Sequence, residues 1–270
     1  MKKALSIAGS DCSGGAGIQA DLKTFSAHGI FGMTAIASVV AENTFRVIEY
    51  QNIEPHIIQM QIDAVFEDIV PDAVKIGMLS CKEGMLAVAT KLREWKPANV
   101  VLDPVMYAKN GCALMDPDSI DTLILEVVPL ADLVTPNIPE AEKMAGISID
   151  SLEDMKHAAA LICQMGCRAV LVKGGHSTGD ATDVLFDGSE YHLYSAERID
   201  TKNTHGTGCT YSSAIASHLA LGLPLDKAVG RAKEYVTTAI RHALAIGSGH
   251  GPTHHFYDLY AKGLLETHDA

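Results

Sequence analysis

Short apolar runs and longer amphipathic runs alternate along most of the chain. The short runs have the length and composition of buried strands, and they cover residues 4–8, 34–41, 73–76, 100–102, 133–134 and 169–172. The amphipathic runs place apolar residues at helical spacing, and they cover residues 57–69, 82–94, 140–145 and 152–165. This alternation predicts an α/β fold, with a central, mostly parallel sheet flanked by helices on both faces. Ligands of such folds bind at the carboxyl ends of the strands, so a site is expected in the loops that follow the strands.

The pattern changes after Gly175. Residues 180–188 and 190–199 have the pattern of the two strands of a β-hairpin, and two helical segments follow them. No linker, low-complexity tract or internal repeat interrupts the chain, so we expect one domain over residues 1–270.

Composition narrows the class of partner. Of the 270 residues, 47% are hydrophobic and 20% are charged, which is typical of a soluble globular protein. The formal net charge of −12 argues against nucleic acid or an anionic membrane as the main partner. It does not exclude an anionic small molecule, because a local group of backbone N–H donors can bind phosphate within an acidic protein.

The sequence also bears on the cellular compartment. The apolar run after Met1, Lys2 and Lys3 is too short for a secretory signal, and no run approaches the roughly 20 apolar residues of a membrane span. The 6 cysteines form no C-x-x-C pair, so neither a disulfide framework nor a zinc site is expected. We therefore expect a cytoplasmic protein that binds no membrane.

A glycine-rich loop connects the first strand to the first helix. It contains Gly15-x-Gly17-x-x-Ala20, which resembles a dinucleotide-binding fingerprint, and Glu42 has the position of the acid that holds a ribose. Several residues separate this pattern from the strand end, however, and a P-loop would need lysine at position 15. Two interpretations stay open: a tight turn that needs glycine for its backbone conformation, and a loop whose N–H groups approach a small ligand.

A second glycine motif, HGTGCT at residues 205–210, stands where an apolar helix is expected to begin. Gly206 and Gly208 let the backbone pass close to a ligand, and the start of a helix is a site for an anion. Cys209 lies in the first turn, where the helix dipole is expected to lower the thiol pKa below about 8.5. A packed, unreactive cysteine is the alternative.

Several motifs together resemble one known family. The hydroxymethylpyrimidine and phosphomethylpyrimidine kinases of thiamine biosynthesis share, in the same order, IAGSDCSGGAGIQADLKTFSAHG, KIGML, VLDPVM, TPNIPEAE, VKGGH and TKNTHGTGCT. The resemblance extends from residue 4 to about residue 245. These kinases belong to the ribokinase superfamily, beside the pyridoxal kinases. The resemblance implies a ribokinase-like fold with a small β-hairpin flap, and a kinase that uses ATP and Mg²⁺.

The resemblance assigns the catalytic residues. Cys209 occupies the position of the catalytic base, where the wider superfamily has aspartate. The N–H groups of Gly206, Thr207 and Gly208, together with that of Cys209, would form an anion hole for the transferring phosphoryl group. Phosphoryl transfer depends on positioning and charge stabilisation more than on covalent catalysis, so such a site is sufficient. Lys109 matches a flexible flap from which a lysine meets substrate or phosphate.

Metal and nucleotide residues follow in the same way. Asn137 and Glu140 correspond to the N-x-x-E motif of the family, which holds Mg²⁺ near the ATP phosphates. A helix start with Pro139 in its first turn is the alternative. The residues expected beside ATP are Lys173, Gly174, Gly175, Thr201, Lys202 and Asn203.

The resemblance also implies a small, mostly apolar slot for a flat aromatic ring. The expected substrate-binding residues, beside Cys209, are Gly9, Asp11, Ala16, Asp21, Glu42, Met78 and Val105. For Met78 and Val105, a simple core position is the alternative.

Glu42 departs from the family pattern, which usually has glutamine at this position. An amide donates and accepts hydrogen bonds at once, whereas an ionised carboxylate only accepts. We therefore expect a bias toward phosphomethylpyrimidine over the free alcohol and over pyridoxal. Cys112, where the family flap often carries a polar residue, is expected to have no effect.

The leading hypothesis is a kinase that makes hydroxymethylpyrimidine diphosphate from phosphomethylpyrimidine, with free hydroxymethylpyrimidine as a second acceptor. One alternative is a pyridoxal or pyridoxine kinase of vitamin B6 salvage, which has the same architecture. Another is an NAD(P)-dependent oxidoreductase that uses the loop from Gly15 to Ala20. The family is commonly dimeric, so we expect a homodimer.

Overall fold

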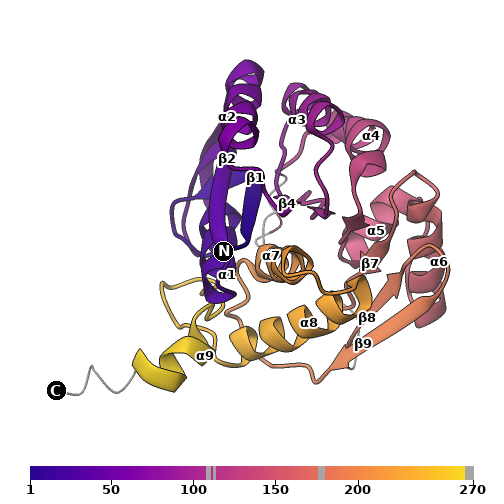
Figure 1. Cartoon of the computed structure of the whole chain (residues 1–270). Coiled ribbons are helices and arrows are strands. Elements are labelled where there is room, and N and C mark those ends of the chain that lie inside the picture. Colours follow the sequence, from indigo (N-terminus) through magenta and orange to yellow (C-terminus); the bar gives the residue numbers. More distant parts are fainter. Residues whose placement is uncertain (108–110, 112–113, 176–179, 265–270) are drawn as a thin grey trace.

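The computed structural model describes residues 1–107, 111, 114–175 and 180–264. In this part of the chain one sheet has the strand order β3-β2-β1-β4-β5-β6-β7-β8-β9 (Figure 1). The strands are β1 Lys3–Asp11, β2 Phe31–Glu42, β3 Val47–Asn52, β4 Ala73–Ile76, β5 Val100–Leu102, β6 Leu133–Val134, β7 Val170–Val172, β8 Ala181–Phe186 and β9 Tyr191–Ala196. Neighbouring strands from β2 to β7 are parallel, whereas β3 at one edge and β8 and β9 at the other pair antiparallel. The central parallel sheet is therefore confirmed.

Helices cover both faces of this sheet (Figure 1). The longer ones are α1 Gly17–Ala27, α2 Pro55–Asp68, α3 Lys82–Trp95, α5 Ile138–Ala145, α6 Leu152–Cys163, α7 Thr207–Ala220 and α8 Leu225–Arg241. Short helical turns are α4 Ile120–Thr122, which continues through residues 123–130, and α9 Tyr257–Leu259, which continues to residue 264. Within the described residues, no helix combines the length and the apolar character needed to cross a membrane.

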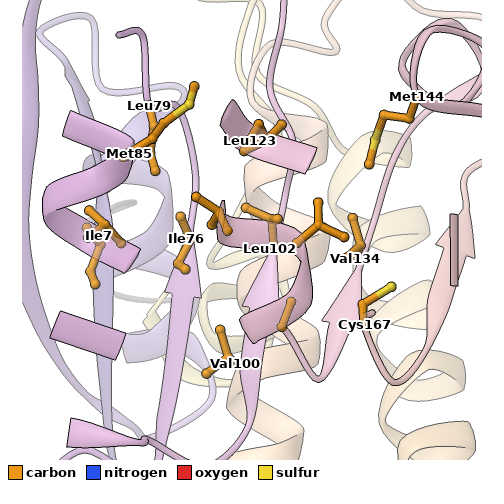
Figure 2. Close-up of a cluster of buried hydrophobic side chains, with 14 of the residues drawn as sticks. Ile7, Ile76, Leu79, Met85, Val100, Leu102, Leu123, Val134, Met144 and Cys167 are labelled. Atoms are coloured by element: carbon orange, nitrogen blue, oxygen red, sulfur yellow. The ribbon is translucent and has the colours of Figure 1, made fainter. Parts of the chain in front are cut away.

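The side chains of each strand point alternately to the two faces of the sheet, so the buried side chains form two hydrophobic cores, one on each face. Ile7, Ile76 and Leu102 point to one face, where Figure 2 shows them packed with Met85 of α3 and with Leu123. The intervening strand residues point to the other face and pack against α1, α7 and α8. Successive residues of a strand point to opposite faces of the sheet. The helices on both faces therefore pack against the same short strands.

The predicted elements are confirmed, with ends that differ by a few residues. The strand predicted for residues 34–41 is longer and covers Phe31–Glu42, and the predicted hairpin forms as β8 and β9. This hairpin continues the central sheet beside β7. Strand β3 was not predicted; its residues are half-buried or exposed, so it lacks the apolar run of an inner strand.

Candidate active site

A cavity of about 680 Å³ lies at the carboxyl ends of the parallel strands. This volume falls within the roughly 300–1,000 Å³ of small-molecule sites. Predicted residues from loops that are distant in sequence come together in its wall: Gly9, Ala16, Glu42, Met78, Val105, Asn137, Glu140, Lys173, Gly175, Gly206, Thr207, Gly208 and Cys209. A cavity therefore lies at the edge of the sheet where the sequence predicts the site.

Helix α7 begins at the cavity wall with a glycine in a left-handed conformation. Gly206 has φ 74° and stands at the N-cap. The N–H groups in the first turn of a helix have no intrahelical acceptor, and Gly208 and Cys209 belong to that turn. The N–H of Thr207 donates to the carbonyl of Thr204 at 3.3 Å. The helix start thus presents the N–H groups of Gly208 and Cys209, with the positive end of the dipole, to an anion.

The two glycine loops touch each other. A Cβ on Gly206 would overlap the carbonyl oxygen of Gly15, so this contact requires glycine. In the facing loop, the carboxylate of Asp11 accepts the N–H groups of Ser13, Gly15 and Ala16 at 2.7, 3.0 and 2.7 Å. The expectation that this loop offers its N–H groups to a ligand is therefore wrong for Gly15 and Ala16. The dinucleotide interpretation loses the same two donors.

His205 joins the two loops. Its Nε2 lies 2.8 Å from Asp11 Oδ2, and its backbone N–H donates to the carbonyl of Gly251 at 3.0 Å. Burial would raise the pKa of Asp11, but the hydrogen bonds from His205 and Ser13 hold that pKa well below its usual value. Asp11 is thus an ionised residue that fixes the loops, and it does not line the cavity.

The thiol of Cys209 is protonated at neutral pH. Burial raises its pKa to about 11, and the charges of Asp21 and Asp103 act in the same direction. The ammonium of Lys75 and a hydrogen bond from the backbone of Gly17 oppose this rise. The expectation of a lowered pKa is therefore wrong, because loss of water destabilises the thiolate more than the helix dipole stabilises it.

Beneath the cavity lies a fully buried ion pair. Lys75 Nζ lies 2.9 Å from both carboxylate oxygens of Asp21, and both side chains are 0% exposed. The hydroxyls of Ser6 and Ser213 donate to the same carboxylate at 2.6 and 2.7 Å. Asp21 is enclosed below the site, which corrects its expected place among the substrate contacts. It holds Lys75, whose charge acts on Cys209.

A second charged cluster lies in the cavity wall. Lys173 Nζ lies 2.8 Å from Asp103 Oδ1, which also accepts the hydroxyl of Thr135 at 3.2 Å. Burial would lower the pKa of Lys173, but the charges of Asp103 and Glu140 raise it. Burial raises the pKa of Glu140 to about 7, with Asp103 adding to the rise and Lys173 opposing it. Asp103 was missed as a site residue, although it opens the conspicuous DPVM motif after β5.

Asn137 and Glu140 form a reciprocal capping box at the start of α5. The N–H of Glu140 donates to Asn137 Oδ1 at 3.0 Å, and the N–H of Asn137 donates to Glu140 Oε2 at 2.8 Å. The helix-start interpretation therefore holds. The cluster also suits a hard divalent cation, because Glu140 and Asp103 are buried carboxylates whose mutual repulsion such a cation would relieve.

The residues expected beside ATP fall into two groups. Lys173 and Gly175 line the cavity. Outside its wall lie Gly174, Thr201, Lys202 and Asn203. The side chain of Asn203 accepts the N–H of Gly251 at 3.1 Å, so this segment supports the loop that carries the α7 motif.

The cavity wall near Gly174 contains residues that sequence reasoning missed. Lys233 of α8 donates to Asp183 Oδ2 at 2.7 Å, and Asp183 Oδ1 accepts the N–H of Gly174 at 2.9 Å. Tyr211 of α7 lies beside them, with its ring centroid 5.9 Å from Lys233 Nζ. No sequence signal marks this group, because its members come from three elements far apart along the chain.

The end of the cavity near β2 is more apolar. Met78 packs with Val40 and Leu114 in a small buried cluster, and Val105 lies against it. Met78 and Val105 also line the cavity, so their packing in this cluster does not exclude a contact with a ligand, and the ring slot stays a prediction. Glu42 is the carboxyl group at this end.

Two sequence predictions concern residues that the structure does not describe. Lys109 and Cys112 lie outside the described residues, so their roles stay predictions. The cysteines within the described part are free thiols: Cys12, Cys81, Cys163, Cys167 and Cys209.

Comparison with known proteins identifies relatives over nearly the whole chain. The family model of phosphomethylpyrimidine kinase matches residues 11–254. A hydroxymethylpyrimidine/phosphomethylpyrimidine kinase of Rhizobium meliloti is 51% identical over 258 residues, which cover 94% of this chain and 97% of the relative. A thiamine biosynthesis bifunctional protein of Geobacter sulfurreducens is 50% identical over 252 residues. These residues cover 93% of this chain but 51% of that protein, so the chain spans about half its length.

A solved structure shows the same fold. A pyridoxal kinase of Bacillus subtilis, determined as an ADP complex, has a TM-score of 0.88 at 38% identity, covering 95% of this chain and 98% of that one. The likeness confirms the ribokinase-like α/β architecture expected from the sequence. With the family model matched over residues 11–254 and a kinase relative at 51% identity, the chain belongs to the phosphomethylpyrimidine kinase family and is a phosphotransferase.

Proposed function

We propose that this protein transfers the γ-phosphoryl group of ATP to phosphomethylpyrimidine, making hydroxymethylpyrimidine diphosphate for thiamine biosynthesis. Free hydroxymethylpyrimidine is its second acceptor. The observation that carries the proposal is one cavity that joins an apolar slot, beside Met78 and Val105, to the anion-binding start of α7. A flat ring in the slot would direct its substituent toward the N–H groups of Gly208 and Cys209.

The chain's own groups would position the phosphates. The N–H groups at the start of α7 would supply the preorganised donors that a transferring phosphoryl group needs. Lys173 retains its charge in the wall, because Asp103 and Glu140 raise its pKa. Lys109, which the family resemblance assigns to a flap, is our proposal for a further cation at the phosphates.

A magnesium ion would be held by Glu140 and Asn137, with Asp103 beside them. When bound, Mg²⁺ supplies positive charge that neutralises the ATP phosphates during transfer. In the structure the capping box already uses an oxygen of Asn137 and of Glu140. We therefore propose that these residues hold the ion largely through its bound waters.

The protonated thiol of Cys209 favours the phosphate acceptor. A phosphomonoester is largely dianionic at neutral pH, since its second pKa is about 6, and it needs almost no base. A free hydroxymethyl group must lose a proton, which a thiol with a pKa of about 11 accepts only after losing its own. We propose that Cys209 acts as base for the alcohol and contributes little to the second phosphorylation.

Pyridoxal kinase remains the second candidate, because a pyridoxal kinase matches this fold with a TM-score of 0.88. The two activities share the architecture and differ in the ring that the slot accepts. The sequence relatives at higher identity favour the thiamine assignment.

Further features of the protein are proposed on the family resemblance. We propose a single kinase domain over residues 1–270, which the one continuous sheet supports. We also propose a homodimer located in the cytoplasm.

The proposal is tested by ADP release from MgATP with hydroxymethylpyrimidine, its monophosphate, pyridoxal and pyridoxine offered in parallel. We expect turnover of the monophosphate. In a Cys209→Ala variant we expect a larger loss of kcat for the free alcohol than for the monophosphate. Equal losses for both acceptors would contradict the role of the thiol, and turnover of pyridoxal alone would move the protein to vitamin B6 salvage.

A further inference from the structure

Glu42 presents an unpaired carboxyl group to the ring end of the cavity. It is the last residue of β2, and its main chain is held by Cys12: the Cys12 thiol donates to the Glu42 carbonyl at 3.1 Å, and the Glu42 N–H donates to Cys12 Sγ at 3.4 Å. The side chain lines the cavity and is half-buried. Among the described residues, no hydrogen bond involves its carboxyl oxygens. The backbone is thus fixed while the carboxyl group remains open to a ligand.

A second carboxylate lies next to it. One oxygen of Asp11, one oxygen of Glu42 and a ring nitrogen of His205 all lie within 4.8 Å of one another. Asp11 already accepts three backbone N–H groups and the His205 ring. These donors stabilise negative charge on Asp11, so Asp11 is the ionised member of the pair.

The neighbouring charge favours a proton on Glu42. Two carboxyl groups this close in a partly buried site do not ionise independently, and the one with fewer donors keeps its proton to higher pH. Burial, reinforced by the charge of Asp11, raises the pKa of Glu42 to about 7, while His205 acts in the opposite direction. Cys12, Asp11 and His205 are the titratable groups that face Glu42 among the described residues.

We propose that Glu42 binds the acceptor ring as a carboxylic acid, so that the complex holds one proton between this side chain and a ring nitrogen. The proposal rests on the function proposed above and specifies how an aminopyrimidine is selected. It assigns Glu42 as the specificity-determining residue of the acceptor site and Asp11 as the residue that keeps it protonated.

The protonated carboxyl group of Glu42 and the edge of an aminopyrimidine ring have complementary hydrogen-bonding groups. An aminopyrimidine carries a ring nitrogen, which accepts, beside an exocyclic amino group, which donates. The acid O–H donates to the ring nitrogen, and the acid carbonyl accepts from the amino group. Transfer of the proton to the ring gives a carboxylate paired with an aminopyrimidinium, and the proton count stays the same. A pyridine ring without an adjacent amino group receives only one of these two hydrogen bonds.

This mode of binding is linked to pH. Above the pKa of Glu42 the free protein must take up a proton to bind the ring, so the dissociation constant rises by up to about tenfold per pH unit. A glutamine at the same position makes both hydrogen bonds without a proton. The dissociation constant of the Glu42→Gln variant for the ring therefore does not change over the same pH range.

The test is equilibrium binding of hydroxymethylpyrimidine by titration calorimetry, without ATP, at pH 6.5, 7.5 and 8.5. Repeating each titration in buffers of different ionisation enthalpy measures the protons taken up. For the wild-type protein we expect uptake that approaches one proton at pH 8.5, and affinity that falls with pH. For Glu42→Gln we expect no uptake and a level affinity. Glu49→Gln, on the exposed side of β3, is the matched control and should behave as wild type.

Two results would overturn the proposal. The first is equal proton uptake by the wild-type protein and by Glu42→Gln, provided that the variant keeps the wild-type thermal midpoint. This result would mean that a group other than Glu42 takes up the proton on binding. The second is wild-type binding without proton uptake at pH 8.5. Either result leaves the kinase assignment standing if the monophosphate is still turned over. Failure of the wild-type protein to bind the pyrimidine at any pH would contradict the proposed function and this inference together.

Discussion

Replacement of Lys75 by methionine would test the ion pair beneath the active site. Methionine keeps the length of the side chain but removes the ammonium that lies 2.9 Å from both oxygens of Asp21. Among the described residues, the hydroxyls of Ser6 and Ser213 would then be the donors left to the buried carboxylate. Removing one partner of a buried pair costs about 3–5 kcal/mol, because it leaves an uncompensated charge. We expect a loss of that size in the free energy of unfolding.

A second substitution should recover much of this loss. In the double variant Lys75→Met, Asp21→Asn the buried charge is gone. The asparagine carbonyl still accepts one serine hydroxyl, and its amide donates to the other. We expect the double variant to be more stable than Lys75→Met by at least about 2 kcal/mol, although neither substitution restores the ion pair.

Urea unfolding of the four proteins in this cycle measures the effect, provided that the slopes of the transitions agree. A cost below about 1 kcal/mol for Lys75→Met would show that Asp21 does not carry an uncompensated charge in the variant. Additive losses in the double variant would refute the reasoning at its base, because they would mean that the two side chains do not interact.

Two further perturbations probe the loops around α7. Gly206→Ala adds a Cβ that overlaps Gly15, so we expect the glycine loops to separate and kcat to fall about a hundredfold. Gly222→Ala is the matched control: its φ of 89° is also left-handed but nothing lies within 4 Å of the added Cβ, so it should cost about 1–2 kcal/mol and leave kcat unchanged. Burial lowers the pKa of His255 to about 4, so between pH 6.5 and 4 the unfolded chain binds a proton that the native protein does not. The free energy of unfolding should therefore decrease, by up to about 3 kcal/mol, as the pH is lowered from 6.5 to 4. The decrease should be smaller in His255→Gln, and urea midpoints measured at each pH would show the difference.

The parallel core was predictable because its strands are buried on both faces. Residues 73–76, 100–102 and 170–172 are short apolar runs, and such runs between amphipathic helices specify inner strands. Strand β3 carries no such signal. Its exposed Ile48 and Glu49 give it the pattern of an edge, which composition alone does not separate from a loop.

Site residues that directly follow strands were predictable, because the carboxyl ends of parallel strands meet at one edge of the sheet. Side-chain pairs between elements distant in sequence were not predictable. The ring of His205 pairs with Asp11, 194 residues away in sequence, and Lys75 pairs with Asp21, 54 residues away. Nothing in the local sequence pattern shows that the carboxylate of Asp11 will accept hydrogen bonds from three backbone N–H groups and a histidine ring. The position of Cys209 in the first turn of α7 was correct, but its pKa depended on burial, which sequence spacing does not measure.

The structure also shows how a protein of net charge −12 can bind a polyanion. Glu42 and Glu140 line the cavity, and burial raises the pKa of each to about 7, so each is partly neutral at physiological pH. Cys209 is protonated, while Lys173 keeps its charge because carboxylates surround it.

The cavity is consequently less negative than the composition predicts, and an arriving phosphate would meet helix N–H groups and ammonium charge rather than a ring of carboxylates. The same burial that keeps Cys209 protonated, and so without a thiolate ready to accept a proton, thus lowers the repulsion felt by ATP. A site built in this way suits an acceptor that brings its own negative charge to the reaction. That is the electrostatic reason why we propose the phosphomonoester, rather than the free alcohol, as the preferred substrate.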